Sequence, residues 1–239
     1  MTGLSLPDTR FGKTTDLVEP QLTQKLERNE LRARLERMCR SGQSNGHTQP
    51  VALPTGFAQF DAVLPDGGWP VGAITELMPQ AQGIGELSLL MPALAQLSRA
   101  GRYIAWIAPP CLPYPLALEQ HGLVLERLLL VPGRGATQTA LWAAEQALRC
   151  PAIGAVLAWP TSLDDRRVRR LQLAAETGGS CGLLFRPAVA AQQSSPAALR
   201  LRLHAVNTDA GAGLHIEIQK VRGGRTHALV VHPAAALCA

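Results

Sequence analysis

Aromatic residues are scarce in this chain: Phe, Trp and Tyr together make up 4% of its 239 residues. Proteins that hold single-stranded nucleic acid by base stacking need exposed aromatic rings, so we expect any nucleic-acid contact here to be made to phosphates. Long apolar runs are absent too. The longest, such as 152–159, fall far short of the about 20 residues that cross a bilayer, and the N-terminus lacks a signal-peptide core. We therefore expect a cytoplasmic protein that makes no membrane contact.

Patterns that bind metals or form disulfides are also missing. The five cysteines are odd in number and widely spaced, at positions 39, 111, 150, 181 and 238, and none belongs to a C-x-x-C pair. The six histidines show no H-E-x-x-H or similar spacing. These spacings indicate neither a disulfide framework nor a zinc site. We expect reduced thiols and no bound metal.

Basic residues gather in the last third of the chain. The formal net charge is +5, and residues 161–239 hold ten Lys or Arg against five Asp or Glu. This excess is compatible with contact to phosphates or to an acidic partner. A solvated, arginine-rich surface explains the same composition, and both interpretations stay open.

Composition divides the chain into five segments. Apolar residues recur at helical spacing near the N-terminus, which predicts an amphipathic helix that packs on the domain or binds another protein, a second copy included. A stretch rich in Gly, Ser and Asn follows it and is typical of a linker. The segments are a flexible arm (1–19), the amphipathic helix (20–40), the linker (41–50), the folded domain (51–232) and a tail (233–239).

The segment 73–90 combines a short β-type run, a Gly-containing turn and a helical apolar pattern, which is where a P-loop would lie. A P-loop reads G-x-x-x-x-G-K-[ST]: its backbone N–H groups surround phosphates, its Lys reaches the outer phosphates and its hydroxyl holds magnesium. Gly83 and Gly85 are present here, but Glu86 stands at the Lys position and Leu87 at the Ser/Thr position. A like charge about 4 Å from a phosphate costs about 4 kcal/mol at an effective dielectric of 20. The turn therefore predicts a degenerate nucleotide site.

The sequence around this turn resembles a known family. The segments PTGFAQFD (54–61) and GGWPVGAITE (67–76) are similar to those that precede the ATP-binding loop of the RecA recombinase core. With PQAQGIGEL in place of that loop, the chain resembles ImuA, the RecA-like accessory proteins of a bacterial translesion-synthesis cassette, sometimes labelled SulA-like. The resemblance covers about residues 53–221.

The resemblance implies an α/β fold with a RecA-like core, in which a mostly parallel, twisted sheet is flanked by helices. Strict alternation of apolar and polar residues over 199–203 and 214–221, around a Gly-containing turn, predicts a C-terminal β-hairpin. The helix predicted over 20–40 adds an N-terminal helical extension to this core.

Two carboxylates that the RecA-like ATPases use are also missing. The strand predicted over 152–160 should end in the magnesium-linked Asp of a Walker B motif, but Ala158 and Trp159 stand there. The strand predicted over 102–108 should be followed by an acidic general base, but a proline-rich loop follows it and the next carboxylate is Glu119. We therefore expect no catalytic residue, no cofactor and no enzymatic activity.

The resemblance also implies a function. It would be that of a non-catalytic accessory protein in the mutagenic translesion synthesis that DNA damage induces as part of the SOS response. Its partners would be ImuB, an inactive homologue of Y-family polymerases, and an error-prone C-family DNA polymerase, with RecA and DNA as further contacts. Two alternatives stay open: a divergent ATPase of the RecA superfamily, and a SulA-like inhibitor of cell division that binds the tubulin-like division protein.

Nine basic residues are the candidates for contact with DNA or a partner. Four arginines lie on a helix that is predicted to start near residue 162, and two alternate with leucines on the strand over 199–203. Three more follow in and after the second strand of the hairpin, where they are expected to share a surface with those two. The nine are Arg166, Arg167, Arg169, Arg170, Arg200, Arg202, Lys220, Arg222 and Arg225.

Overall fold

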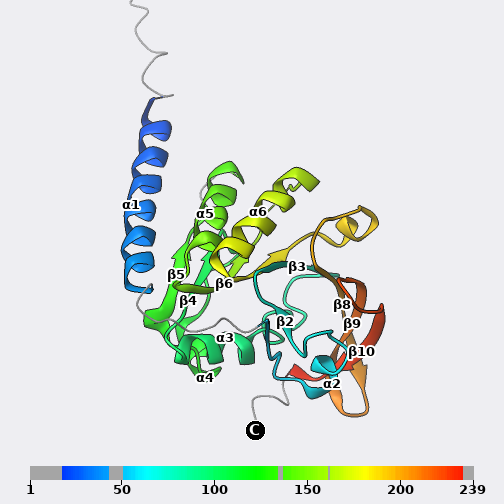
Figure 1. The fold of residues 1–239 in the computed structure, drawn as a ribbon. Coiled ribbons are helices and arrows are strands. Elements are labelled where there is room, and N and C mark those ends of the chain that lie inside the picture. The colour runs from blue at the N-terminus through cyan, green and yellow to red at the C-terminus, as the bar shows by residue number, and fades with distance from the viewer. Residues whose placement is uncertain (1–17, 43–50, 134–136, 161, 234–239) are drawn as a thin grey trace, which may run out of the picture.

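Runs of Leu, Ile and Val form one eight-stranded mixed sheet in a computed structural model that describes residues 18–42, 51–133, 137–160 and 162–233 (Figure 1). The order across this sheet is β10-β9-β8-β3-β7-β6-β4-β5. Its strands are β3 (Ala73–Pro79), β4 (Tyr103–Ile107), β5 (Leu128–Val131), β6 (Ile153–Ala158), β7 (Cys181–Phe185), β8 (Leu199–Thr208), β9 (Gly211–Val221) and β10 (His227–Val231). A separate antiparallel pair joins β1 (Ala52–Leu53) to β2 (Trp69–Pro70).

The sheet changes character at β8. The six strands from β8 to β5 run parallel, whereas β8, β9 and β10 form an antiparallel meander. Parallel strands are covered on both faces, which explains their almost unbroken apolar sequences. The meander alternates instead, so Leu201 and Leu203 of β8 enter the core while Arg202 between them faces the other way.

Helices cover both faces of the sheet, as Figure 1 shows. One face packs against α5 (Thr137–Arg149) and α6 (Asp165–Gly178), with α1 (Val18–Gly42) outside α5. The other face packs against α2 (Ala58–Asp61), α3 (Met91–Arg99) and α4 (Pro115–Gln120). Two short 3-10 turns, η1 (Leu125–Arg127) and η2 (Ala188–Gln192), complete the elements of the described residues. None of the helices described is at once long and apolar enough to cross a membrane.

The helix α1 lies where the sequence predicts an amphipathic helix. Of its described side chains, Leu35 and Met38 are buried against the α5 side of the molecule. The same helix carries Cys39, which forms a disulfide with Cys150 after the end of α5. The expectation of reduced thiols is therefore wrong for these two residues. Their separation of 111 positions contains no local pattern that could have revealed the pair.

The turn after β3 is followed by a late helix start. The apolar helical pattern begins at Leu87, but α3 begins only at Met91, with Pro92 in its first turn. Proline fits there because the first backbone N–H groups of a helix have no intrahelical acceptor. Residues 1–17, 43–50 and 234–239, which hold most of the predicted arm, linker and tail, lie outside the described residues.

Candidate functional site

In the turn between β3 and α3, a backbone N–H group binds a carboxylate of the turn itself. Gly83 and Gly85 both adopt positive φ, at 77° and 102°, which lets the chain fold back on itself. The backbone N–H of Gly83 donates to Oε1 of Glu86 over 2.9 Å. In a P-loop, backbone N–H groups of this turn would donate to a phosphate. Here the carboxylate of Glu86 accepts this hydrogen bond in place of a phosphate. The side chain of Leu87 packs against the core.

A cavity of about 490 Å³ opens beside this turn, at the carboxyl ends of β3, β4, β6 and β7. In open α/β sheets this edge is the usual place for a ligand. Trp159 and Phe185 stack in the wall of the cavity with ring centroids 4.5 Å apart, and Trp106 lies 5.9 Å from Trp159. Of the two positions predicted for a degenerate Walker B motif, Trp159 lines the cavity and Ala158 is buried in the core.

The backbone is constrained at the rim of this cavity. Ala108, which lines it, has φ of 52°, a left-handed conformation that costs a residue other than glycine about 1–3 kcal/mol. Gly133 lies against it, and a Cβ at that position would stand 2.6 Å from the Cβ of Ala108. Strained backbone of this kind gathers at ligand sites, so it adds weight to the cavity as a candidate site.

Two charged side chains line the cavity, and they differ in their partners. Arg186 is buried and donates to Oε1 of Glu76 over 2.7 Å and to the backbone oxygen of Leu163 over 3.1 Å. Glu86 is 8% exposed, and its Oε2 is buried without a hydrogen-bond partner among the described residues. The cavity therefore has one carboxylate oxygen that still lacks a donor.

Glu76 is the centre of a buried ion cluster next to the cavity. Its side chain on β3 is fully buried and accepts from Arg186 at Oε1 and from Arg200 at Oε2, each over 2.7 Å. Ser195 also donates to Oε1 over 3.0 Å. Glu76 is not among the candidate site residues predicted from the sequence. A charge inside an otherwise apolar strand was the available signal, because a buried carboxylate needs a cationic or hydrogen-bonding partner.

Arg200 is not on the predicted basic surface. The residue is 6% exposed, and its guanidinium also donates to the backbone oxygens of Gln193 and Ala190, each over 2.8 Å. Alternation correctly separates it from the neighbouring leucines, but η2 and the loop after it cover that face of β8. Lys220, its neighbour on β9, donates to the backbone oxygen of Ser195 over 2.6 Å.

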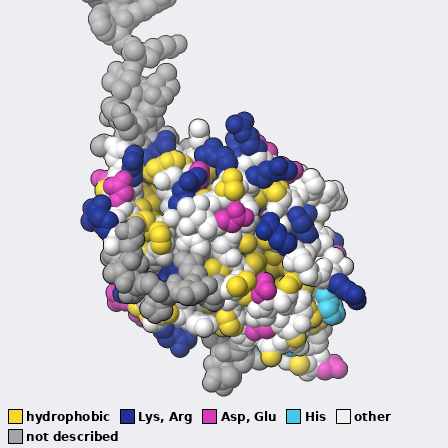
Figure 2. All heavy atoms as spheres, in the orientation of Figure 1, with side chains coloured by type: hydrophobic (Ala, Val, Ile, Leu, Met, Phe, Trp, Pro, Cys, Tyr) yellow, Lys and Arg dark blue, Asp and Glu magenta, His cyan; other side chains and the backbone are white. Residues whose placement is uncertain are grey.

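The remaining basic residues fall into two groups. Near the sheet edge, Arg202 is half-buried and forms an ion pair with Glu217, while Lys220, Arg222 and Arg225 are exposed. The second group is on α6, where Figure 2 shows basic side chains gathered over the helices of this face. Its exposed members are Arg166, Arg167, Arg169 and Arg170.

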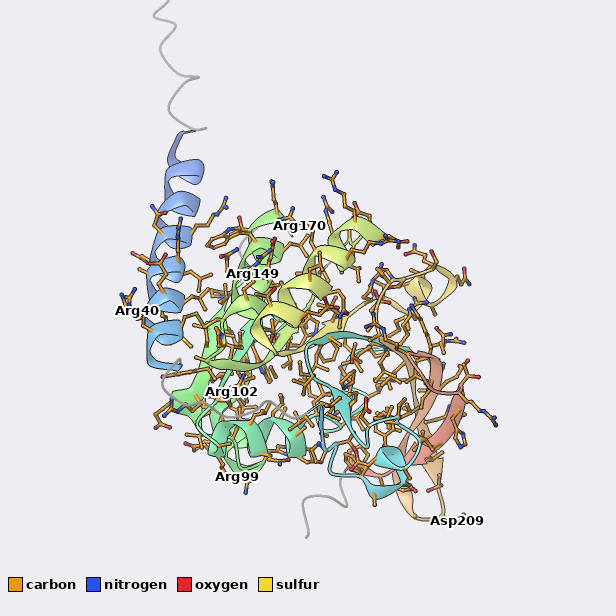
Figure 3. All side chains as sticks on the ribbon, viewed as in Figure 1. Arg40, Arg99, Arg102, Arg149, Arg170 and Asp209 are labelled. Atoms are coloured by element: carbon orange, nitrogen blue, oxygen red, sulfur yellow. A yellow bond between two sulfur atoms is a disulfide. The ribbon has the colours of Figure 1, made fainter. Side chains whose placement is uncertain are left out.

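The α6 group extends to neighbouring helices. Arg170 forms an ion pair with Glu145 of α5, which also binds Arg149 over 3.0 Å. Figure 3 shows Arg149 and Arg170 on these neighbouring helices. Arg28 of α1 lies 4.6 Å from the ring centre of Trp142 and, with Arg167 and Arg170, lines a cavity of about 280 Å³ between the three helices. Arg28 is exposed, and no feature of its sequence context marks it.

Apolar side chains are exposed on the proline-rich loop that follows β4 and at the start of α4. Leu112, Tyr114 and Leu116 are 74%, 66% and 55% exposed. This loop leaves the sheet at the edge where the cavity lies, and its Pro110 lines that cavity. The side chains of Leu112 and Tyr114 therefore lie in solvent and do not cap the core. Such a patch is typical of a surface that contacts another protein.

Comparisons with known proteins identify a family for the middle of the chain. A family model described as "Cell division inhibitor SulA" matches residues 72–182, from the start of β3 into β7. SulA of Yersinia pestis (strain Pestoides F) is 30% identical over 134 residues, which cover 56% of this chain and 79% of that protein. SulA of Serratia marcescens is 29% identical over 116 residues, which cover 48% and 68%. A crystal structure of SulA from Pseudomonas aeruginosa has 29% identity and a TM-score of 0.40, and the match covers 47% of this chain and 97% of that one.

The expectation of a RecA-like core is wrong. The family that matches the segment with the supposed ATP-binding loop is that of a cell division inhibitor and not that of a RecA-like ATPase. The misleading signal was a set of short glycine-containing segments before a strand, a turn and a helix. Many α/β proteins need glycine at such turns for backbone reasons, so these segments do not specify an ATPase fold.

Proposed function

The chain belongs to the SulA family of cell division inhibitors, and from that premise we propose that it inhibits division by binding the tubulin-like division protein. The mode of action is protein binding without catalysis. One observation carries this proposal: the turn that would hold a nucleotide in an ATPase is closed by its own carboxylate, Glu86. What remains at the same edge is an apolar surface suited to protein contact.

The closed turn argues against the alternative of a divergent ATPase. A triphosphate placed there would have to displace the bond from Gly83 to Glu86 and would stand next to the carboxylate it displaces. Leu87 offers no oxygen to magnesium, and α3 starts four residues later with a proline in its first turn. A labelled ATP analogue titrated with magnesium should therefore show no saturable binding, whereas saturable binding would support the ATPase.

The contact surface that we propose is the loop after β4 and the start of α4, with the exposed Leu112, Tyr114 and Leu116. Apolar and aromatic side chains at the centre of an interface supply most of its binding energy. Residues on this loop can change without loss of the fold, because their side chains contribute little to the core. The loop therefore allows a clean test of binding.

The test is inhibition of assembly of the purified tubulin-like division protein, together with direct binding by calorimetry. A variant with Leu112→Ala and Tyr114→Ala should bind at least about tenfold more weakly than the unmodified protein. The matched control is Leu173→Ala, which removes a side chain of similar exposure from α6. No binding by the unmodified protein would overturn the proposed function, and equal loss in both variants would overturn the surface.

An accessory role in translesion synthesis remains a second candidate. Part of the sequence that carries the resemblance, the segment 54–61, lies outside residues 72–182, which the family model matches. The exposed arginines of α6 add a surface that could meet DNA phosphates. The protein should then be isolated from DNA-damaged cells and its companions identified. Recovery of the ImuB-like protein, the C-family polymerase or RecA would favour this role, and recovery of the division protein alone would favour inhibition of division.

A further inference from the structure

The cavity at the carboxyl edge of the sheet, between Glu86 and the stacked rings of Trp159 and Phe185, has a chemistry that the proposed function leaves unused. We infer that this cavity binds the guanidinium group of an arginine on an extended segment of a partner protein. The chemistry of this ligand is the same whether or not the partner belongs to the division machinery.

The first support is the unmatched oxygen of Glu86. This side chain is more than nine-tenths buried, and the Gly83 N–H binds Oε1 alone. Oε2 has no hydrogen-bond partner in the described part of the chain. A buried carboxylate oxygen without a donor is destabilising, because it has lost its hydrogen bonds to water and has gained none in return. A ligand that brings an N–H group into the cavity would recover this cost.

The second support is the balance of charge around the cavity. Arg186 is the other charged residue in its lining, and its guanidinium is already committed to Glu76, Leu163 and Gln193. Glu76 is shared between Arg186 and Arg200. Both buried arginines therefore face Glu76, and Glu86 is left without a cation among the described residues. The uncompensated carboxylate of Glu86 therefore favours binding of a cation over binding of a phosphate.

The third support is the nature of the walls, which distinguishes guanidinium from ammonium. Apart from Glu86, Arg186 and two glutamines, the wall consists of proline, alanine and aromatic side chains. Guanidinium is planar and weakly hydrated, so its faces can lie against apolar groups while its edge donates hydrogen bonds. An ammonium group is strongly hydrated and would lose more on entering such a cavity. The cavity of about 490 Å³ has room for the side chain of one arginine and the backbone next to it.

The position of the cavity favours a protein segment over a free small molecule. The exposed apolar residues of the loop after β4 and the exposed Val189 of η2 border the same edge of the sheet. An extended segment whose arginine enters the cavity would lie against these side chains. In such an interface the apolar contacts outside the cavity would bury surface from water. The charged contact inside the cavity would select the partner, as charged groups do in other interfaces.

The test uses three capped tripeptides, acetyl-Gly-X-Gly-amide with X as arginine, citrulline or lysine, titrated into the full chain while the indole N–H signal of Trp159 is followed by NMR. The arginine peptide should bind at least about tenfold more tightly than the citrulline peptide, which has the same shape and no charge, and more tightly than the lysine peptide. Agmatine serves as the free small-molecule probe and should bind no more tightly than the arginine peptide.

Two variants and one control complete the test. Glu86→Gln keeps an acceptor for the Gly83 N–H and should abolish the preference for arginine over citrulline. Gln82→Lys, on the lining of the cavity, supplies an internal cation and should weaken the arginine peptide by a similar factor even if Glu86→Gln does not fold. Glu119→Gln, an exposed carboxylate on α4, should change nothing. Equal binding of arginine and citrulline peptides, or binding of agmatine alone, would overturn the inference. A failure here with intact binding of the division protein would leave the proposed function standing.

Discussion

Two regions of this molecule place one glutamate between two arginines, and they differ in burial. In the interior, Glu76 is fully buried, and the side chains of Arg186 and Arg200 are each 7% exposed. On the helical layer, Glu145 is 12% exposed, but the side chains of Arg149 and Arg170 are 47% and 62% exposed. The residue types and the number of ion pairs are the same.

The difference teaches that burial, and not the count of ion pairs, decides what such a cluster does. The Glu76 cluster ties β3, β7, β8 and the loop after η2 together through additional bonds to Ser195 and to backbone oxygens. Removing one partner there leaves buried charges without compensation, which costs about 3–5 kcal/mol. The arginines of the Glu145 cluster can turn to water, so the same loss is worth about 0–1 kcal/mol.

The largest effect is therefore expected from Glu76→Gln. This change keeps the shape of the side chain and removes the charge, so two buried guanidinium groups would face a neutral amide. The free energy of unfolding, measured by urea denaturation, should fall by about 3–5 kcal/mol. A loss below about 1 kcal/mol would mean that water reaches the cluster, and the comparison between the two regions would then fail.

For Arg200, the sequence predicts the direction of the side chain but not its burial. Alternation along 199–203 predicts which residues share a face, since side-chain direction in a strand has a period of two. Alternation cannot predict that η2 and the loop after it lie over the polar face of β8, because the sequence of that segment shows no helical or strand periodicity. A residue expected on the surface is therefore part of the interior.

The turn after β3 could also be predicted only in part, because its hydrogen bonds depend on segments that are distant in the sequence. The acidic residue at position 86 is visible in the sequence. The bond from the Gly83 N–H to Glu86 and the unmatched second oxygen depend on backbone angles and on distant strands. The apolar run 152–160 predicts a strand well because burial on both faces leaves a clear signal. The SulA-like part of the resemblance is confirmed by the comparisons, whereas the glycine motifs that pointed to a RecA-like core recur across unrelated folds.

The second largest effect is expected from a covalent link in the helical layer, whose described residues form no buried ion cluster like that of Glu76. The disulfide between Cys39 and Cys150 links α1 to the end of α5 across 111 residues. Disulfides that close long loops stabilise proteins by about 2–4 kcal/mol. Adding a reductant should lower the free energy of unfolding by this amount in the unmodified protein. It should have no effect on a variant with Cys39→Ala and Cys150→Ala, and a stability that ignores the reductant in the unmodified protein would contradict the link.

A third effect concerns an interior thiol. Burial in β7 raises the pKa of Cys181 from 9.0 to about 12. The thiol is protonated in both states below pH 9, but between pH 9 and about 12 the unfolded chain loses a proton that the folded chain keeps. Stability is therefore fully present below pH 9 and falls as the pH rises, by at most about 1.4 kcal/mol per pH unit.

In a background with Cys111→Ser, which removes the exposed free thiol, this loss should reach about 1–2 kcal/mol between pH 8.5 and 10.5. A further Cys181→Ala change should abolish that part of the slope and leave the part that other groups contribute. Identical slopes with and without Cys181 would show that water reaches this position of β7.

The smallest effect is expected at the surface counterpart of Glu76. Glu145→Gln also keeps the shape of its side chain and leaves two arginines without their shared carboxylate. Both guanidinium groups are about half exposed or more, so water can replace the lost contact, and the free energy of unfolding should change by less than about 1 kcal/mol. Added salt should reduce even this difference, because exposed charges are screened. A loss as large as that of Glu76→Gln would instead mean that the packing of α5 on α6 depends on this ion pair, and burial would no longer explain the difference between the two regions.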